Sequence, residues 1–185
     1  QARLTGAGTS DVLVFVHGFR VSFEEAARRA AQIAFDLQFD GAVVLFSWAS
    51  LGSLIGYSGD EDRARTSAQD LARFLAALET GPWRRLHLLA HSMGTRVIIG
   101  ALAGRREPVR AVGSVVIVAG DMYTPEFRQQ FPAVTAALHG HSAPVTSYAS
   151  RTDRALLISS WIHRADRVGF FEAEFRIFTQ ADYES

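Results

Sequence analysis

The sequence predicts an α/β domain, in which a mainly parallel sheet of about six strands carries helices on both faces. Two observations predict this class. Short apolar runs rich in Val and Leu recur along the chain, and segments of ten or more helix-forming residues separate them. Unalternating apolar runs are typical of strands covered on both faces, and strand–helix alternation is typical of right-handed βαβ units. Without an internal repeat or linker, residues 1–185 are expected to form a single domain.

Each element follows from its local pattern. The apolar runs predict strands at Asp11–His17, Ala42–Trp48, Arg85–His91, Val112–Ala119, Val145–Ala149 and Glu174–Thr179. Helices are predicted at Ser22–Gln38, Asp60–Leu78, Ser92–Ala103, Thr124–Leu138 and about Arg154–Arg164. Ser22 followed by Glu25 three positions later is a capping-box pattern, and Pro132 is expected to interrupt the fourth helix.

Composition excludes several classes of function. Nineteen Lys and Arg residues balance nineteen Asp and Glu residues, so neither nucleic acid nor an anionic membrane surface is an expected partner. The chain has no cysteine, which excludes disulfides and thiolate catalysis, and no cluster with ligand spacing predicts a metal or other cofactor. No apolar run approaches the roughly 20 residues of a transmembrane helix.

The first residue is Gln1 and not Met. We therefore expect further segments before and after the given residues, and a removed signal peptide is compatible with this start. The compartment and the oligomeric state do not follow from the sequence.

The segment Ala90-His91-Ser92-Met93-Gly94 lies between an expected strand and an expected helix. A nucleophile in a sharp strand-to-helix turn needs small residues two positions before and after it, and Ala90 and Gly94 meet this need. The turn also places Ser92 at a helix N-terminus, which favours developing negative charge. The alternative is that Ser92 only caps the helix. The flanking elements favour a nucleophile.

Acyl transfer requires two hydrogen-bond donors that face the developing oxyanion. The backbone amide of Met93, directly after the nucleophile, would supply one donor. The loop after the first strand, His17-Gly18-Phe19, would supply the other through the amide of Phe19, because Gly18 allows a turn there. A His-Gly pair alone indicates only a turn, and the pairing with Ser92 makes it specific.

Four stretches carry a resemblance to a known superfamily: VFVHGF at Val14–Phe19, LFSWAS at Leu45–Ser50, LLAHSMGTRV at Leu88–Val97 and YASRTDRAL at Tyr148–Leu156. The chain resembles the α/β-hydrolases, in particular a bacterial family whose function is unknown, over roughly Val12–Gly169. The resemblance implies a minimal α/β-hydrolase fold without a large lid, and a serine-hydrolase mechanism. The family usually has Pro at the position of Ala49 and Asn at the position of Arg20.

Two carboxylates compete for the role of catalytic acid. Asp153 follows the fifth expected strand and matches the carboxylate of the family's triad, although it could instead cap the helix that begins at Arg154. Asp121, after the fourth strand, is the rival. We favour Asp153.

No histidine of the sequence fits the catalytic base well. His163 follows Asp153 in the expected order, but ten helical residues would separate the two by about 15 Å and turn them about 80° apart. The other histidines lie before the fifth strand (His139, His141), in mid-strand (His87), beside the nucleophile (His91) or in the oxyanion loop (His17). We therefore expect the base after Ser185, where the family has a Gly-His-Ser stretch.

An apolar, aromatic rim is expected around the nucleophile. It consists of Phe19, Trp48, Leu51, Met93, Met122 and Tyr123. Such a rim favours a short acyl or aromatic ester as the small-molecule substrate, although loop packing would explain the same residues. A non-catalytic binding module on a hydrolase scaffold, or an acyltransferase, thioesterase or peptidase, remains the alternative.

Overall fold

The computed structural model describes residues 11–50, 57–109, 112–138, 143–150 and 175–178. Its strands are β1 (Asp11–Val16), β2 (Gly41–Phe46), β3 (Leu86–His91), β4 (Val112–Val118), β5 (Val145–Ser150) and β6 (Phe175–Phe178). Its helices are α1 (Phe23–Asp36), α2 (Tyr57–Glu79), α3 (Gly94–Ala103) and α4 (Thr124–Leu138). The expected helix at about Arg154–Arg164 lies outside the described residues.

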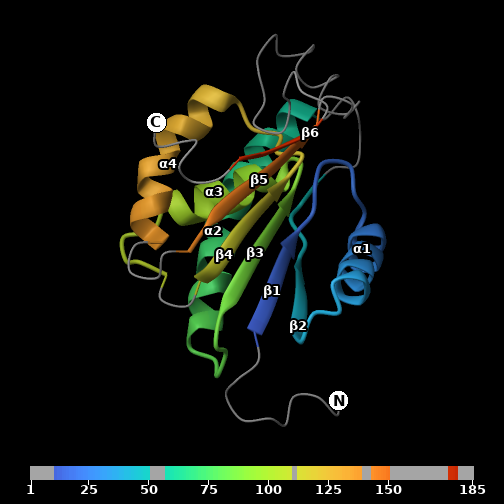
Figure 1. The fold of residues 1–185 in the computed structure, drawn as a ribbon. Helices are drawn as coiled ribbons and strands as arrows, with labels where there is room; N and C mark the ends of the chain where they lie inside the picture. The colour runs from blue at the N-terminus through green and yellow to red at the C-terminus, as the bar shows by residue number, and fades with distance from the viewer. Residues whose placement is uncertain (1–10, 51–56, 110–111, 139–142, 151–174, 179–185) are drawn as a thin grey trace.

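The strands form one sheet in the order β2-β1-β3-β4-β5-β6 (Figure 1). Strands β1 to β5 run parallel, and β6 runs antiparallel to β5 at the sheet edge. The predicted mainly parallel sheet of about six strands is therefore confirmed. Parallel pairing brings the carboxyl ends of β1 to β5 to one edge, which is where open α/β sheets bind ligands.

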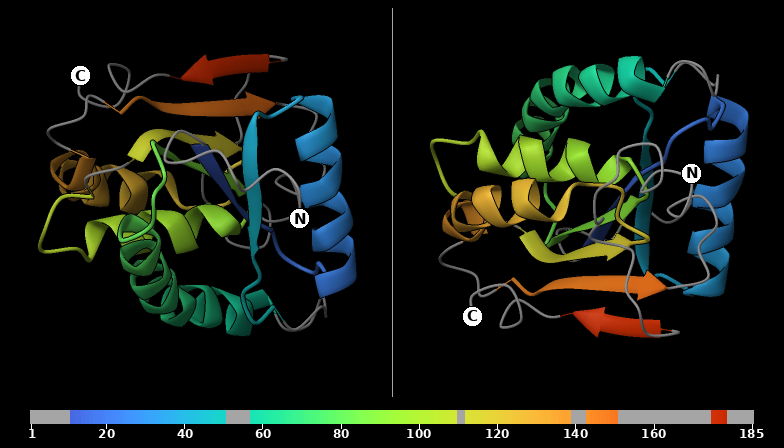
Figure 2. Two further views of the ribbon diagram at one scale, coloured as in Figure 1. Left: turned by 90° about the horizontal axis from the view of Figure 1, so that it is seen from below. Right: turned by 90° about the horizontal axis from the view of Figure 1, so that it is seen from above.

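Helices lie on both sides of the sheet, as Figure 2 shows: α1 lies on one side, and α2, α3 and α4 lie on the other. Alternate residues of β3 (Leu86, Leu88 and Ala90) are completely buried in the core that includes α2, α3 and α4. This core removes a large apolar area from water, which is the main favourable contribution to folding. It holds the start of α3 firmly against the ends of β1 and β3.

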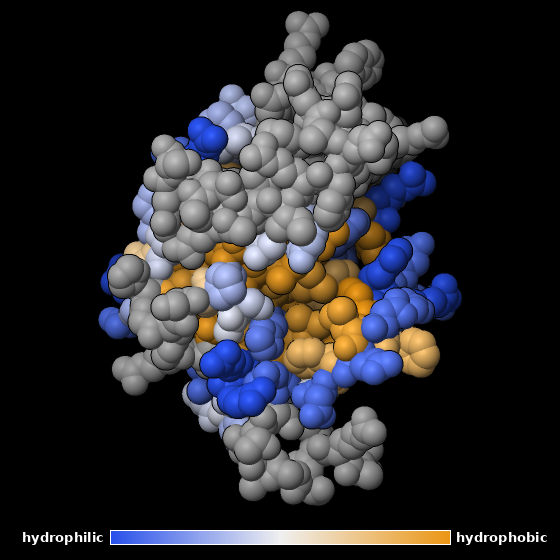
Figure 3. All heavy atoms as spheres, viewed as in Figure 1, coloured by the Kyte–Doolittle hydropathy of each residue, from blue (hydrophilic) through white to orange (hydrophobic). Residues whose placement is uncertain are grey.

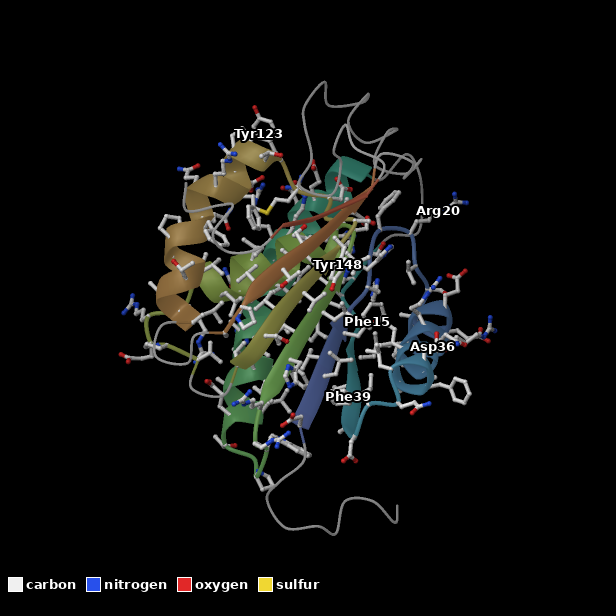
Figure 4. All side chains as sticks on the ribbon, viewed as in Figure 1. Phe15, Arg20, Asp36, Phe39, Tyr123 and Tyr148 are labelled. Carbon is white, nitrogen blue, oxygen red and sulfur yellow. The ribbon has the colours of Figure 1, made fainter. Side chains whose placement is uncertain are left out.

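The side of the sheet that carries α1 is more open. A cavity of about 660 Å³ lies between α1 and the sheet, with Phe15, Leu89, Val118 and Ile33 among its lining residues. Figure 3 shows hydrophobic residues across the centre of this face, and Figure 4 shows Phe15 between β1 and α1. Gly18 and His91 also line the cavity, so it extends to the carboxyl edge of the sheet.

The bounds of α4 agree with the sequence, whereas α2 begins three residues earlier than expected, at Tyr57, and α3 begins two residues later, at Gly94. The strand ends differ in an informative way. Ser22 caps α1 through the predicted capping box with Glu25. Strands β1 and β2 end one and two residues earlier than expected, which releases His17, Ser47 and Trp48 into the loops at the carboxyl edge.

Helix α4 continues through Pro132. The missing N–H removes one helical hydrogen bond, and burial of Phe127, Phe131 and Val134 on the same helix offsets that loss. Among the described helices, none combines the length and the apolar character that crossing a membrane requires.

Candidate active site

Ser92 occupies a strained turn between β3 and α3. Its φ is 51°, a left-handed conformation that a residue other than glycine adopts at an energetic cost. The Ser92 N–H donates to the Val118 carbonyl (3.0 Å), and the Ser92 carbonyl accepts from the N–H groups of Asp121 (3.1 Å) and Thr95 (3.0 Å). Strain of this kind persists only where surrounding contacts enforce it, and it clusters at functional sites. The Ser92 residue itself remains partly exposed.

The small residue two positions after Ser92 is required by the packing. A Cβ atom at Gly94 would lie 2.5 Å from the Val16 carbonyl oxygen and 2.6 Å from the His17 carbonyl oxygen. Both are backbone atoms at the end of β1, so they cannot rotate away as a side chain could. Gly94 therefore allows α3 to begin directly against β1, and this close approach sets the position of Ser92.

The loop after β1 lies directly against the turn. A Cβ atom at Gly18 would lie 2.9 Å from Ser92 Cβ and 2.9 Å from His91 Nδ1. Phe19 follows Gly18 in this loop and is partly exposed. On the other side of Ser92, the amide of Met93 has no acceptor within the described residues. The two segments expected to donate to an oxyanion thus flank Ser92.

His17 is a buried structural residue of this loop. Its ring lies parallel to the Trp48 ring, with the centroids 5.5 Å apart, and its Nδ1 is 2.9 Å from the Gly18 carbonyl oxygen. Because a carbonyl only accepts, Nδ1 carries the proton, and Nε2 accepts from the Ser47 hydroxyl at 3.2 Å. Burial lowers the pKa of His17 below its ordinary value, which favours this neutral form.

The backbone of Asp121, the rival acid, lies against the turn. It is 3% exposed, and its N–H donates to the Ser92 carbonyl. Its own carbonyl accepts from Nε of Arg96, a residue of α3 that also forms ion pairs with Glu61 of α2 (2.7 Å) and Glu126 of α4 (3.3 Å). Arg96 therefore connects three helices to the loop that holds Asp121.

The described histidines do not supply a base. No side chain of the described ranges hydrogen-bonds to the Ser92 hydroxyl. His91 is exposed and points to the α1 cavity. His87 is bonded to Ser114 (2.8 Å) and lies 3.4 Å from Asp11, which belongs to the opposite, amino end of the sheet.

The expected rim residues have different environments. Trp48 is 4% exposed and Met122 is 1% exposed, so both contribute to packing and offer little surface to a substrate. Tyr123 is 42% exposed and lies at the same end of the molecule as Arg20 (Figure 4). Leu51, Asp153 and His163, together with His139 and His141, lie outside the described residues.

Sequence reasoning missed two groups that support the site. The first is Arg96, whose charge in a predominantly apolar helix was the available signal. The second is the contact of Ser50 with Asp60, two residues ten positions apart whose types alone gave no signal that they meet.

Residues 1–181 match the family model described as alpha/beta hydrolase of unknown function (DUF900), and the chain belongs to this family. Among solved structures, the chain is similar to the type II thioesterase YbtT of the yersiniabactin biosynthetic pathway, with 22% identity and a TM-score of 0.44 over 61% of this chain and 43% of that one. It is also similar to phospholipase PlaB from Legionella pneumophila, with 17% identity and a TM-score of 0.35 over 60% of this chain and 25% of that one.

The chain thus spans less than half the length of either enzyme. A comparison with curated proteins gives no match.

Proposed function

We propose that this α/β hydrolase is a serine esterase that cleaves short acyl or aromatic carboxylic esters through an acyl-enzyme on Ser92. The observation that carries the proposal is the left-handed conformation of Ser92, held between Val118 and Asp121 with Gly18 packed against its Cβ. Backbone strain of this kind clusters at functional sites, and a partly exposed serine in a strand-to-helix turn supports a nucleophilic role for Ser92.

In this proposal the Ser92 hydroxyl oxygen attacks the ester carbonyl and transfers its proton to a base. The developing oxyanion accepts hydrogen bonds from the Phe19 and Met93 amides, and the N-terminus of α3 adds favourable electrostatics. The protonated base gives its proton to the departing alcohol oxygen as the intermediate collapses. The same base then takes a proton from a water molecule, which attacks the acyl-enzyme and releases the carboxylic acid and free Ser92. The base in this proposal is a histidine outside the described residues.

The substrate class is proposed from the apolar surroundings of Ser92. Phe19 and Tyr123 offer partly exposed aromatic surface at this edge, and the cavity beside Gly18 and His91 has an apolar floor. The aromatic rings and the apolar floor suit an acyl chain or an aromatic group, while Arg20, Arg28 and Arg29 line the same cavity.

The test uses p-nitrophenyl acetate and a fluorophosphonate probe. The full chain should hydrolyse the ester and become labelled, and Ser92→Ala should lose at least about 10³-fold in kcat together with all labelling. Thr80→Ala is the matched control, because it removes an exposed hydroxyl that follows the C-terminal end of α2, before β3 begins and so opposite the carboxyl edge of the sheet, and it should leave both readouts intact. Normal turnover by pure Ser92→Ala protein would contradict the assignment.

The acid is tested by comparing two variants. Asp153→Asn should lower kcat strongly if Asp153 orients the base, as we propose, and Asp121→Asn should then have a smaller effect. The reverse order of effects would assign the role to Asp121.

A second candidate is a non-catalytic binding module on the same scaffold. Failure of the fluorophosphonate to label the full chain would favour this candidate. If labelling succeeds, product analysis with competing alcohol, thioester and amide substrates separates an esterase from an acyltransferase, a thioesterase or a peptidase.

A further inference from the structure

The loop that contains Phe19 is held by Trp48 at His17, two residues before Phe19. The indole Nε1–H of Trp48 donates to the His17 carbonyl at 2.7 Å, and the two rings lie in parallel contact. Trp48 belongs to the segment that follows β2. The backbone leading into Phe19 is therefore fixed by the neighbouring loop and not only by its own hydrogen bonds.

The same segment also holds the loop on the side that follows Phe19. The backbone N–H of Arg20 donates to the Ser50 hydroxyl oxygen at 3.1 Å. Arg20 has a φ of 55°, a left-handed conformation that an arginine adopts at an energetic cost. Ser50 supports this conformation by fixing the direction of the Arg20 N–H.

The Ser50 hydroxyl is oriented by a buried charge. Its Oγ lies 2.7 Å from Oδ2 of Asp60, a residue of the first turn of α2 with no exposed surface. The Ser50 hydroxyl is the donor in this contact, so its single proton points to Asp60. The lone pairs of Ser50 are then left for the Arg20 N–H. The contact with a charge is also stronger than one with a neutral acceptor.

We propose that Asp60 is a positioning residue for ester hydrolysis, which acts through Ser50 to hold the Phe19–Arg20 backbone in the conformation that presents the Phe19 amide to the oxyanion. This inference rests on the proposed function. Asp60 itself touches neither substrate nor Ser92 in this proposal. Its buried charge orients Ser50, Ser50 fixes the Arg20 amide, and the left-handed turn at Arg20 sets the direction of the preceding peptide.

The energetic consequence falls on the transition state. The negative charge on the ester oxygen develops only as the bond to Ser92 forms, so a displaced Phe19 amide weakens transition-state binding and leaves ester binding nearly unchanged. Deleting an oxyanion donor typically costs 10²- to 10³-fold in kcat. Ser50→Ala displaces the donor without deleting it, so we expect a loss of roughly tenfold.

The experiment compares Ser50→Ala, Ser50→Thr and Asp60→Asn with the unsubstituted full chain, using p-nitrophenyl acetate. Ser50→Ala should lower kcat about tenfold with KM within twofold, and Ser50→Thr, which keeps the hydroxyl, should restore most of the kcat. Asp60→Asn keeps an acceptor without the charge and should give an intermediate kcat. If Asp60→Asn does not fold, the Ser50 pair carries the test alone.

A second readout does not depend on activity. Amide hydrogen exchange at Arg20 should be faster in Ser50→Ala and close to that of the unsubstituted chain in Ser50→Thr, because only the first variant removes the acceptor. The inference is overturned if the Arg20 amide exchanges at the same rate in Ser50→Ala as in the unsubstituted chain. It is also overturned if Ser50→Ala raises KM and lowers the melting temperature but leaves kcat unchanged.

The two proposals fail in different ways. If Ser92→Ala abolishes turnover and Ser50→Ala does not lower it, the esterase assignment stands and the positioning role of Asp60 is wrong. If neither the full chain nor any variant reacts with the fluorophosphonate, the esterase assignment fails. The proposed role of Asp60 in catalysis then fails with it, even where Arg20 exchange shows that the hydrogen bonds exist.

Discussion

Replacing Gly94 with Ala tests whether the close contact between α3 and β1 sets the position of the nucleophile. The added Cβ would lie 2.5 Å and 2.6 Å from two carbonyl oxygens, whereas Cβ atoms essentially never approach closer than 3.0 Å. Both oxygens belong to backbone at the end of β1, so relief requires the start of α3 to move by at least about 0.5 Å, and Ser92 and Met93 move with it.

The expected loss has a kinetic part and a stability part. A displacement of about 1 Å costs roughly 10²-fold in rate, so about 0.5 Å predicts a kcat on the order of tenfold lower. Overpacking of a closely packed core costs about 1–3 kcal/mol in the free energy of unfolding, which corresponds to a drop in melting temperature of roughly 2–10 °C in a chain of this size.

The assay measures p-nitrophenyl acetate turnover and thermal unfolding of the same preparations. Gly104→Ala is the control, because Gly104 ends α3 with φ −80° and its Cβ would meet only the Gly100 carbonyl oxygen, at 3.2 Å. The control should retain the full kcat. If Gly94→Ala retains the kcat and melting temperature of the unsubstituted chain, the close approach of α3 to β1 does not position Ser92, and the reasoning is refuted.

Two further predictions concern the charges that hold the fold. Arg96→Met leaves the partly buried carboxylates of Glu61 and Glu126 without their cation, so we expect a loss of about 2–4 kcal/mol in urea unfolding. Arg28→Met, which removes an exposed pair on α1, is its control and should cost little, and equal losses would contradict the assigned role of Arg96. The paired hydrogen bonds from Arg84 lower the pKa of Asp11 to about 2, so the folded chain favours the ionised form. This contribution to stability should be complete above about pH 4 and should disappear as the pH falls through 2, so the difference in unfolding free energy between the unsubstituted chain and Asp11→Asn should shrink over that range. A constant difference would contradict the assigned pKa.

Local sequence patterns predicted most of the fold because local physics decides those features. Unalternating apolar runs identified five parallel strands and the edge strand β6, and Ser22 with Glu25 identified the start of α1. A sharp turn at Ser92 followed from a strand placed directly before a helix, with small residues on either side. These features depend on neighbours within a few positions along the chain.

The burial and the hydrogen-bond partners of the rim residues could not be predicted from local sequence patterns. Trp48 is an aromatic residue in a loop at the carboxyl edge, as is typical of a substrate pocket. However, its N–H donates to the His17 carbonyl and its ring is buried. The role of Asp60 depends on Ser50 and on Arg20, which lies forty positions earlier. Only the packing of α2 beside the loop after β1 brings these groups together.

The sequence by itself determined the order of the elements, the class of the fold and the serine in the turn, since apolar periodicity, helix caps and small residues act over short stretches of chain. Tertiary structure alone decided the left-handed backbone of Ser92, the clash that excludes a side chain at Gly94, and the hydrogen bonds that hold the Phe19 loop. The physical reason is that hydrogen bonds and steric contacts act over about 3 Å in space, and only folding brings residues distant in the chain within that range.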